Sequence, residues 1–130
     1  MDIKRISPEE AMALMGGDEG WTYLDVRTEE EFDEGHAPGA LNIPVAVRTP
    51  RGMQPNPDFL KEVQAELSSD APVITACLRG GRSMRAAALL LEAGFVQVVD
   101  MRGGWDGEMD GFGTIVYPGW LRRGLPVSLD

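Results

Sequence analysis

The stretch "PVITACLRGGRSMRAAALLLEAG", residues 72–94, decides the fold of this chain. It opens with an apolar, β-branched run, residues 72–76, which is typical of a buried strand. It ends with a helical pattern that Gly94 closes, as glycine commonly does at the end of a helix. Between them lies "CLRGGRS", residues 77–83, which holds the only cysteine of the chain. The stretch therefore predicts a strand, a tight turn and a helix.

The same alternation of strands and helices extends over most of the 130 residues. Ser7, Pro8 and Glu10 form the start signal of a helix, because serine caps, proline fits the first position and glutamate completes a capping box. Strands are predicted over residues 21–27, 40–43, 71–77 and 96–101, and helices over 7–15, 28–35, 57–67 and 83–94. Helices of this length suit crossover connections, so the pattern predicts an α/β fold with a mostly parallel sheet that helices cover on both faces.

Two stretches lack a clear pattern. Residues 45–57 are proline-rich and are predicted to be a loop, after which Asn56 caps the next helix and Pro57 starts it. Residues 103–118 are glycine-rich and are also predicted to be a long loop. A short helix and a tail follow in "GWLRRGLPV". The acidic run from Glu29 to Glu34 is interpreted as a solvated helix face.

Composition excludes several classes of function. The net charge is −9, from 12 basic and 21 acidic residues, which argues against binding to nucleic acid or to anionic membranes. A single cysteine cannot form an internal disulfide, and the N-terminus has no apolar signal segment. We therefore expect a cytoplasmic protein with no membrane partner.

Basic charge is nevertheless concentrated around Cys77, where three arginines and no acid occur from residue 77 to residue 85. Cys77 lies at the carboxyl end of a strand, where ligands gather in parallel sheets. The free N–H groups of the next helix favour an anion there. Gly80 and Gly81 would allow a curled loop, and Arg79 and Arg82 add positive charge. An inert, buried cysteine is the alternative. The coincidence of position, glycines and arginines favours a cradle for a thiolate, a persulfide or a bound oxyanion.

Four motifs then occur in an order that resembles the single-domain rhodanese superfamily. They are "LDVR" (24–27), "GHAPGALNIP" (35–44), "CLRGGRS" (77–83) and "GGW" (103–105) with "GLPV" (124–127). The resemblance implies one domain over residues 1–130 with a five-stranded parallel sheet. Residues of about 106–118 depart from the family pattern and are interpreted as an inserted loop that shapes a lid or a partner surface, or has no role.

The resemblance also implies a sulfurtransferase. Cys77 would take a sulfane sulfur from a donor such as thiosulfate and pass it to cyanide or a thiol, with no metal and no cofactor. The substrate-binding residues would be the loop that follows, with its arginines on the sulfonate oxygens: Leu78, Arg79, Gly80, Gly81, Arg82 and Ser83. Because the pair Leu78 and Arg79 is half basic, thiosulfate is favoured over mercaptopyruvate as the donor.

Two other functions stay open. The domain could be a sulfur relay or interaction module that receives a persulfide from a partner protein. A phosphatase or arsenate reductase of the same fold ranks lower. In that class five residues separate cysteine from arginine, whereas four, Leu78 to Gly81, separate Cys77 from Arg82 here. The smaller ring suits a single sulfur atom rather than a tetrahedral oxyanion.

Several other residues have both a structural and a functional interpretation. Asp25 and Arg27 end a neighbouring strand and either support the pocket or form a structural ion pair. Trp105 and Trp120 either line the pocket or pack in the core. His36, the only histidine, is interpreted as structural rather than as a base, and one histidine with one cysteine is too few for a metal site.

Overall fold

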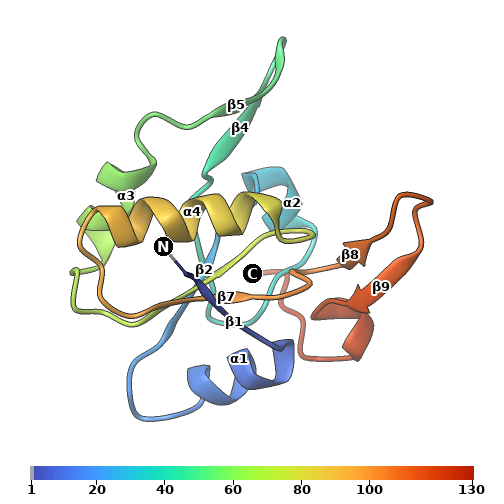
Figure 1. Cartoon of the computed structure of the whole chain (residues 1–130), viewed down its shortest axis with the longest axis horizontal. Helices are drawn as coiled ribbons and strands as arrows, with labels where there is room; N and C mark the ends of the chain where they lie inside the picture. Colours follow the sequence, from blue (N-terminus) through green and yellow to red (C-terminus); the bar gives the residue numbers. More distant parts are fainter. Residues whose placement is uncertain (1) are drawn as a thin grey trace.

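The computed structural model describes residues 2–130, which form a three-layer α/β structure around a five-stranded parallel sheet (Figure 1). The strand order is β1-β7-β6-β2-β3. Their bounds are β1 Lys4–Ile6, β2 Thr22–Asp25, β3 Leu41–Asn42, β6 Val73–Ala76 and β7 Val98–Met101. The predicted fold class and the five-stranded parallel sheet are confirmed.

Helices cover both faces of this sheet. Their bounds are α1 Pro8–Met15, α2 Glu29–Asp33, α3 Phe59–Glu66 and α4 Gly81–Glu92, and a 3₁₀-helix, η1, covers Leu121–Arg123. Neighbouring strand residues point to opposite faces, so Val73 joins the apolar core under α3 and α4, while Ile74 joins the core under α1. Figure 1 shows α4 and α1 on opposite sides of the sheet.

Local sequence signals account for the starts of two helices. Ser7 accepts a hydrogen bond from the Glu10 N–H, and the Glu10 carboxylate accepts one from the Ser7 N–H, which is the predicted capping box. Thr28 and Glu31 form a second capping box at α2. The prediction for α3 was wrong in detail: the helix begins at Phe59, and the Asn56 side chain instead accepts the N–H of Asp58 in the turn before it.

Both stretches predicted to be loops contain an antiparallel β-hairpin. Strands β4 (Ala46–Thr49) and β5 (Gly52–Pro55) pair with each other, as do β8 (Gly107–Met109) and β9 (Ile115–Pro118). Figure 1 shows both hairpins extending away from the central sheet. The strands were not predicted because the β4–β5 segment is rich in proline and the β8–β9 segment is rich in glycine. In the second hairpin, β9 also has a bulge opposite β8.

The carboxyl ends of the parallel strands meet at one edge of the sheet. β6 ends at Ala76 and is followed directly by Cys77, while the neighbouring β2 ends at Asp25. This edge therefore brings together the segments that follow β2, β6 and β7, as the topology of open parallel sheets predicts.

Candidate active site

The Cys77 thiol lies in the turn between β6 and α4, where 2% of the residue is exposed. Its Sγ accepts a hydrogen bond of 3.0 Å from the backbone N–H of Gly80. The thiol also lies 3.4 Å from Oγ of Ser83, whose hydroxyl donates to the Gly80 carbonyl at 3.2 Å. Ser83 Oγ therefore accepts from the thiol, and among residues 2–130 the Gly80 N–H alone donates to Sγ, so fewer N–H groups face the sulfur than the full loop from Leu78 to Ser83 was predicted to offer.

The two glycines of the loop differ in what the backbone requires of them. Gly80 has a φ of +120° and stands at the N-cap of α4, where a Cβ would lie 2.9 Å from Nη2 of Arg5. Gly81 is the first residue of α4, has no positive φ and has open space around it. The expectation that both glycines adopt unusual backbone angles was therefore wrong for Gly81.

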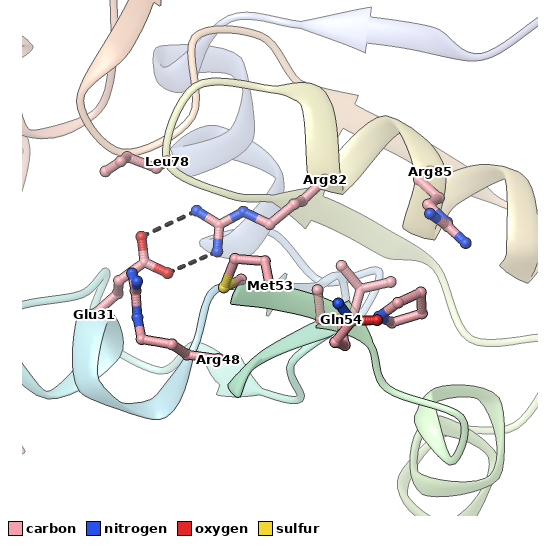
Figure 2. Close-up of a pocket in the computed structure, with 10 residues that line it drawn as sticks. Glu31, Arg48, Met53, Gln54, Leu78, Arg82 and Arg85 are labelled. Carbon is pink, nitrogen blue, oxygen red and sulfur yellow. Dashed lines mark hydrogen bonds and ion pairs between the residues drawn. The ribbon is translucent and has the colours of Figure 1, made fainter. Parts of the chain in front are cut away.

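Both loop arginines already have carboxylate partners. Arg82 forms a bidentate ion pair with Glu31 of α2, with nitrogen-to-oxygen distances of 2.7 and 3.0 Å (Figure 2). Arg79 lies 3.0 Å from Oδ2 of Asp106 and donates to the carbonyl of Gly107 at 3.1 Å. The sequence shows no acid near this loop, because α2 and the segment after β7 supply both carboxylates from a distance.

Glu31 is consequently more than part of a solvated helix face, which corrects that interpretation of the acidic run. Burial opposes its ionisation, but the hydrogen bonds from Arg82 and Thr28 outweigh burial and lower the pKa of Glu31 from 4.5 to about 2. The same hydrogen bond from the other side raises the pKa of Arg82, against the opposing effect of burial. The pair is therefore fully ionised at neutral pH.

A cavity of about 490 Å³ lies between the start of α4, α2 and the β4–β5 hairpin (Figure 2). Leu78 and Arg82 of the loop lie on its wall, so the cavity opens beside the turn that holds Cys77. Its lining consists of Glu31, Val45, Ala46, Arg48, Met53, Gln54, Pro55, Leu78, Arg82 and Arg85. Part of this wall comes from the hairpin that was predicted to be a loop, so sequence reasoning missed Arg48 and Met53.

The motif "GGW" and the residue that follows it, Asp106, hold the loop in place through backbone hydrogen bonds. The N–H of Trp105 donates to the Cys77 carbonyl at 2.7 Å, and the N–H of Asp106 donates to the Leu78 carbonyl at 3.0 Å. Gly104 has a φ of +60°, and a Cβ there would lie 2.4 Å from the Cys77 carbonyl oxygen. Only glycine allows this close approach of two backbones.

Asp25 and Arg27 form a buried ion pair, with 2.8 Å between Nη2 and Oδ2. The same Nη2 donates to the Gly35 carbonyl, and the guanidinium lies 5.0 Å from the ring centroid of Trp105. None of these side chains lines the cavity beside Cys77. They hold together the segments behind the loop, which supports the structural interpretation of the pair.

His36 and Trp120 are also part of the packing. His36 stacks on Phe32 with a centroid distance of 3.6 Å and bridges to the backbone of Ser128. Trp120 is 1% exposed, packs edge-on against Tyr23 and donates its Nε1–H to the Pro126 carbonyl. Neither residue lines the cavity, so both have the structural role.

A buried carboxylate that sequence reasoning missed lies next to the loop. Asp100 of β7 is fully buried and accepts hydrogen bonds from Thr75 at 2.9 Å and from Arg5 at 3.2 Å. Burial raises the pKa of Asp100, against the opposing hydrogen bonds of Ser83 and Thr75 and the charge of Arg5. Its place one residue before the end of a buried strand was the only signal in the sequence.

Comparison with known proteins gives one consistent family. The model of the rhodanese-like domain matches residues 7–108. Thiosulfate sulfurtransferase 16 of Arabidopsis thaliana, named as chloroplastic, is 44% identical over 109 residues, which are 84% of this chain and 81% of that protein. Thiosulfate sulfurtransferase GlpE of Pseudomonas fluorescens is 36% identical over 108 residues, 81% of this chain and 84% of that protein.

A further Arabidopsis thaliana relative, the mitochondrial protein HIGH ARSENIC CONTENT 1, is 45% identical over 91 residues, 70% of this chain but 54% of that protein. Among solved structures, Rv0390 from M. tuberculosis superposes over the full length of both chains, with a TM-score of 0.82 and 27% identity. Within the described residues, no helix has the length and apolar character needed to cross a membrane.

Proposed function

We propose that this chain, which belongs to the rhodanese-like domain family, is a sulfurtransferase that carries a sulfane sulfur as a persulfide on Cys77. The observation that carries the proposal is the Cys77 Sγ, which accepts the Gly80 N–H at 3.0 Å at the carboxyl edge of the sheet. A backbone donor at this place stabilises negative charge on sulfur, both in the thiolate and in the persulfide. The names of two relatives, thiosulfate sulfurtransferases, support thiosulfate as the donor.

In the first step, the Cys77 thiolate attacks the outer sulfur of thiosulfate. A bond forms between Sγ and this sulfur while the sulfur–sulfur bond of thiosulfate breaks, and sulfite leaves with the electron pair. The total charge is unchanged, because a thiolate and a dianion become a persulfide anion and a sulfite dianion. Covalent catalysis of this kind divides one transfer into two easier steps.

In the second step, a nucleophile attacks the outer sulfur of the persulfide. With cyanide, a carbon–sulfur bond forms, the bond to Sγ breaks, and the Cys77 thiolate returns with the electron pair as thiocyanate leaves. The Gly80 N–H stabilises the anionic Sγ at the start and at the end of the cycle, so the site needs no other base.

The ion pairs of the loop modify the predicted role of its arginines. Arg82 bound to Glu31, and Arg79 bound to Asp106, must share their guanidinium groups with a carboxylate while they hold a sulfonate. We therefore expect a modest affinity for thiosulfate, because each arginine is largely neutralised before the substrate arrives.

The test is the formation of thiocyanate from thiosulfate and cyanide. The wild-type protein should turn over, and Cys77→Ser should give only the background rate. Intact mass after thiosulfate treatment should show one added sulfur atom on the wild type and none on the variant. Equal rates for the two proteins would reject the proposal.

A sulfur relay fed by a partner protein is the second candidate, and the neutralised arginines favour it. A protein donor brings its own persulfide and needs no sulfonate site. If this candidate is right, a persulfide-bearing protein donor should load Cys77 faster than millimolar thiosulfate does. Phe112→Ser, a change in the exposed turn between β8 and β9 that leaves Asp106 in place beside the loop, should slow only the protein donor. Loss of both routes to the same extent would count against the relay.

An oxyanion enzyme of the same fold, a phosphatase or arsenate reductase, is a weaker alternative. The relative named for arsenic content makes it worth a direct assay. The four-residue spacing from Cys77 to Arg82 argues against it, so we expect no turnover of an aryl phosphate or of arsenate. A single domain over residues 1–130 and the absence of a cofactor remain predictions. The cytoplasmic location also remains a prediction, because two relatives are named as chloroplastic and mitochondrial.

A further inference from the structure

Two arginines on the cavity wall have no carboxylate partner. Arg48 lies on β4 and Arg85 on α4, and both line the cavity beside Cys77. Across residues 2–130 seven arginines form ion pairs within 4.0 Å, and neither of these two is among them. Both are exposed, so their guanidinium groups are free to bind a ligand.

These free cations are unusual because the chain has a net charge of −9. Arg85 lies one helical turn after Arg82, so both side chains extend from the same face of α4. Figure 2 shows Arg48 across the cavity from α4, on the side where Glu31 meets Arg82. The cavity therefore has an excess of positive charge on two of its walls, inside an acidic molecule.

The rest of the wall is largely apolar. Val45, Ala46, Met53, Pro55 and Leu78 supply it, and Gln54 adds an amide. A volume of about 490 Å³ is much larger than the space that cyanide or thiosulfate needs. The wall thus suits an organic molecule with an aliphatic body and one or more anionic groups.

We propose that this cavity binds the sulfur acceptor, and that the acceptor is a small thiol bearing one or more carboxylates, which Arg48 and Arg85 bind. The proposal rests on the proposed sulfurtransferase function. The forked guanidinium of arginine matches a carboxylate with two parallel hydrogen bonds, and the apolar wall accommodates the carbon chain. Leu78 and Arg82 line the same cavity, so a ligand held there lies beside the loop that carries the persulfide.

The transfer balances without an oxidant. The acceptor thiolate attacks the outer sulfur of the Cys77 persulfide, a new sulfur–sulfur bond forms on the acceptor, and the bond to Sγ breaks. The electron pair of that bond returns to Cys77 as a thiolate, and the transferred sulfur keeps the negative charge that it had in the persulfide anion, so no proton moves and the total charge is unchanged. The products are an acceptor persulfide and the free enzyme.

The experiment compares acceptors of different charge on the persulfide-loaded protein. Mercaptosuccinate, 2-mercaptoethanol and cysteamine bear two carboxylates, no charge and one positive charge, respectively. In a two-step scheme the kcat/KM for the acceptor reports only the second step. The ratio of kcat/KM between mercaptosuccinate and 2-mercaptoethanol is measured for each variant, so that intrinsic thiol reactivity cancels between variants.

In the double variant Arg48→Gln/Arg85→Gln, this ratio should fall by about tenfold, which corresponds to a loss of about 1.4 kcal/mol of binding free energy for the carboxylates. The ratio for cysteamine should rise, because two positive charges are gone. Arg51→Gln is the matched control, since Arg51 lies in the turn of the hairpin whose strand β4 carries Arg48, forms no ion pair within residues 2–130 and does not line the cavity. Its ratio should equal that of the wild type.

An unchanged ratio in the double variant would overturn the proposal, provided that the wild type forms thiocyanate. Failure of the wild type to form thiocyanate or a persulfide at all would instead reject the proposed function. Circular dichroism and urea unfolding of the double variant exclude a folding defect, and the charge-dependent ratio is not altered by a uniform loss of active protein.

Discussion

The ion pair between Glu31 and Arg82 offers the sharpest test of the electrostatics at this site, through Glu31→Gln. Glutamine keeps the shape of the side chain, and it is also accepted at this position of a capping box with Thr28. The substitution therefore removes the negative charge opposite Arg82 and leaves the start of α2 largely intact.

The size of the effect follows from the pKa of Glu31, which is lowered from 4.5 to about 2. Taken in full, that shift corresponds to roughly 3 kcal/mol of stability at pH 7. Each side chain of the pair is 25% exposed, and part of the shift comes from Thr28, so solvent screening and the retained cap reduce the expected loss to about 1 to 2 kcal/mol.

The pH dependence has a definite sign. A carboxyl whose pKa is depressed on folding contributes stability that is complete above 4.5 and is lost as the pH falls toward 2. Urea unfolding of wild type and Glu31→Gln should therefore show the largest gap at pH 7. At pH 3 more than about half of that gap should have closed. Equal urea midpoints at pH 7, or a gap that does not change with pH, would refute this reasoning.

Three further predictions test the neighbourhood of the loop. Gly104→Ala should destabilise the protein by about 2 kcal/mol or more and lower thiocyanate formation, because its Cβ would lie 2.4 Å from the Cys77 carbonyl oxygen at a positive φ; an unchanged urea midpoint would contradict this close backbone contact. Glu31→Gln should also lower the KM for thiosulfate, since Arg82 gains freedom to bind the sulfonate, and a raised KM would mean that Arg82 needs its partner for positioning. For Asp100→Asn, the difference in free energy of unfolding from the wild type should change with pH in the opposite direction from that of Glu31→Gln. Burial raises the pKa of Asp100, so the wild type loses stability as the pH rises above 3.8. The free energy of unfolding of the variant, measured in urea, should therefore increase relative to that of the wild type between pH 3 and pH 7. A relative decrease over this range would show that the ion pair with Arg5 dominates.

Much of the central fold could be predicted from local patterns. The capping boxes at Ser7 and Thr28 depend on residues three positions apart, and the strand before Cys77 is a short apolar run bounded by a turn. The alternation of such strands with helices leaves few topologies other than a parallel sheet. The motifs then pointed to Cys77 and its loop.

Elements without a local pattern were missed. β1 has three residues, of which two are charged and exposed, and it is a strand only because β7 offers a partner. The hairpins β4–β5 and β8–β9 contain proline and glycine, which local propensity assigns to loops. Cross-strand pairing, which local propensity does not include, overrides that preference.

The sequence by itself determined a lone cysteine in a strand–turn–helix unit and a glycine at position 80 that allows the turn. Only the tertiary structure decided the charge around that cysteine. Glu31 reaches Arg82 from 51 residues away and Asp106 reaches Arg79, while Arg48 and Arg85 have no carboxylate partner among residues 2–130. The reason is physical: helical caps and turns depend on neighbours in the chain, whereas the electrostatics of a site depends on which charges the folded backbone brings within a few ångströms.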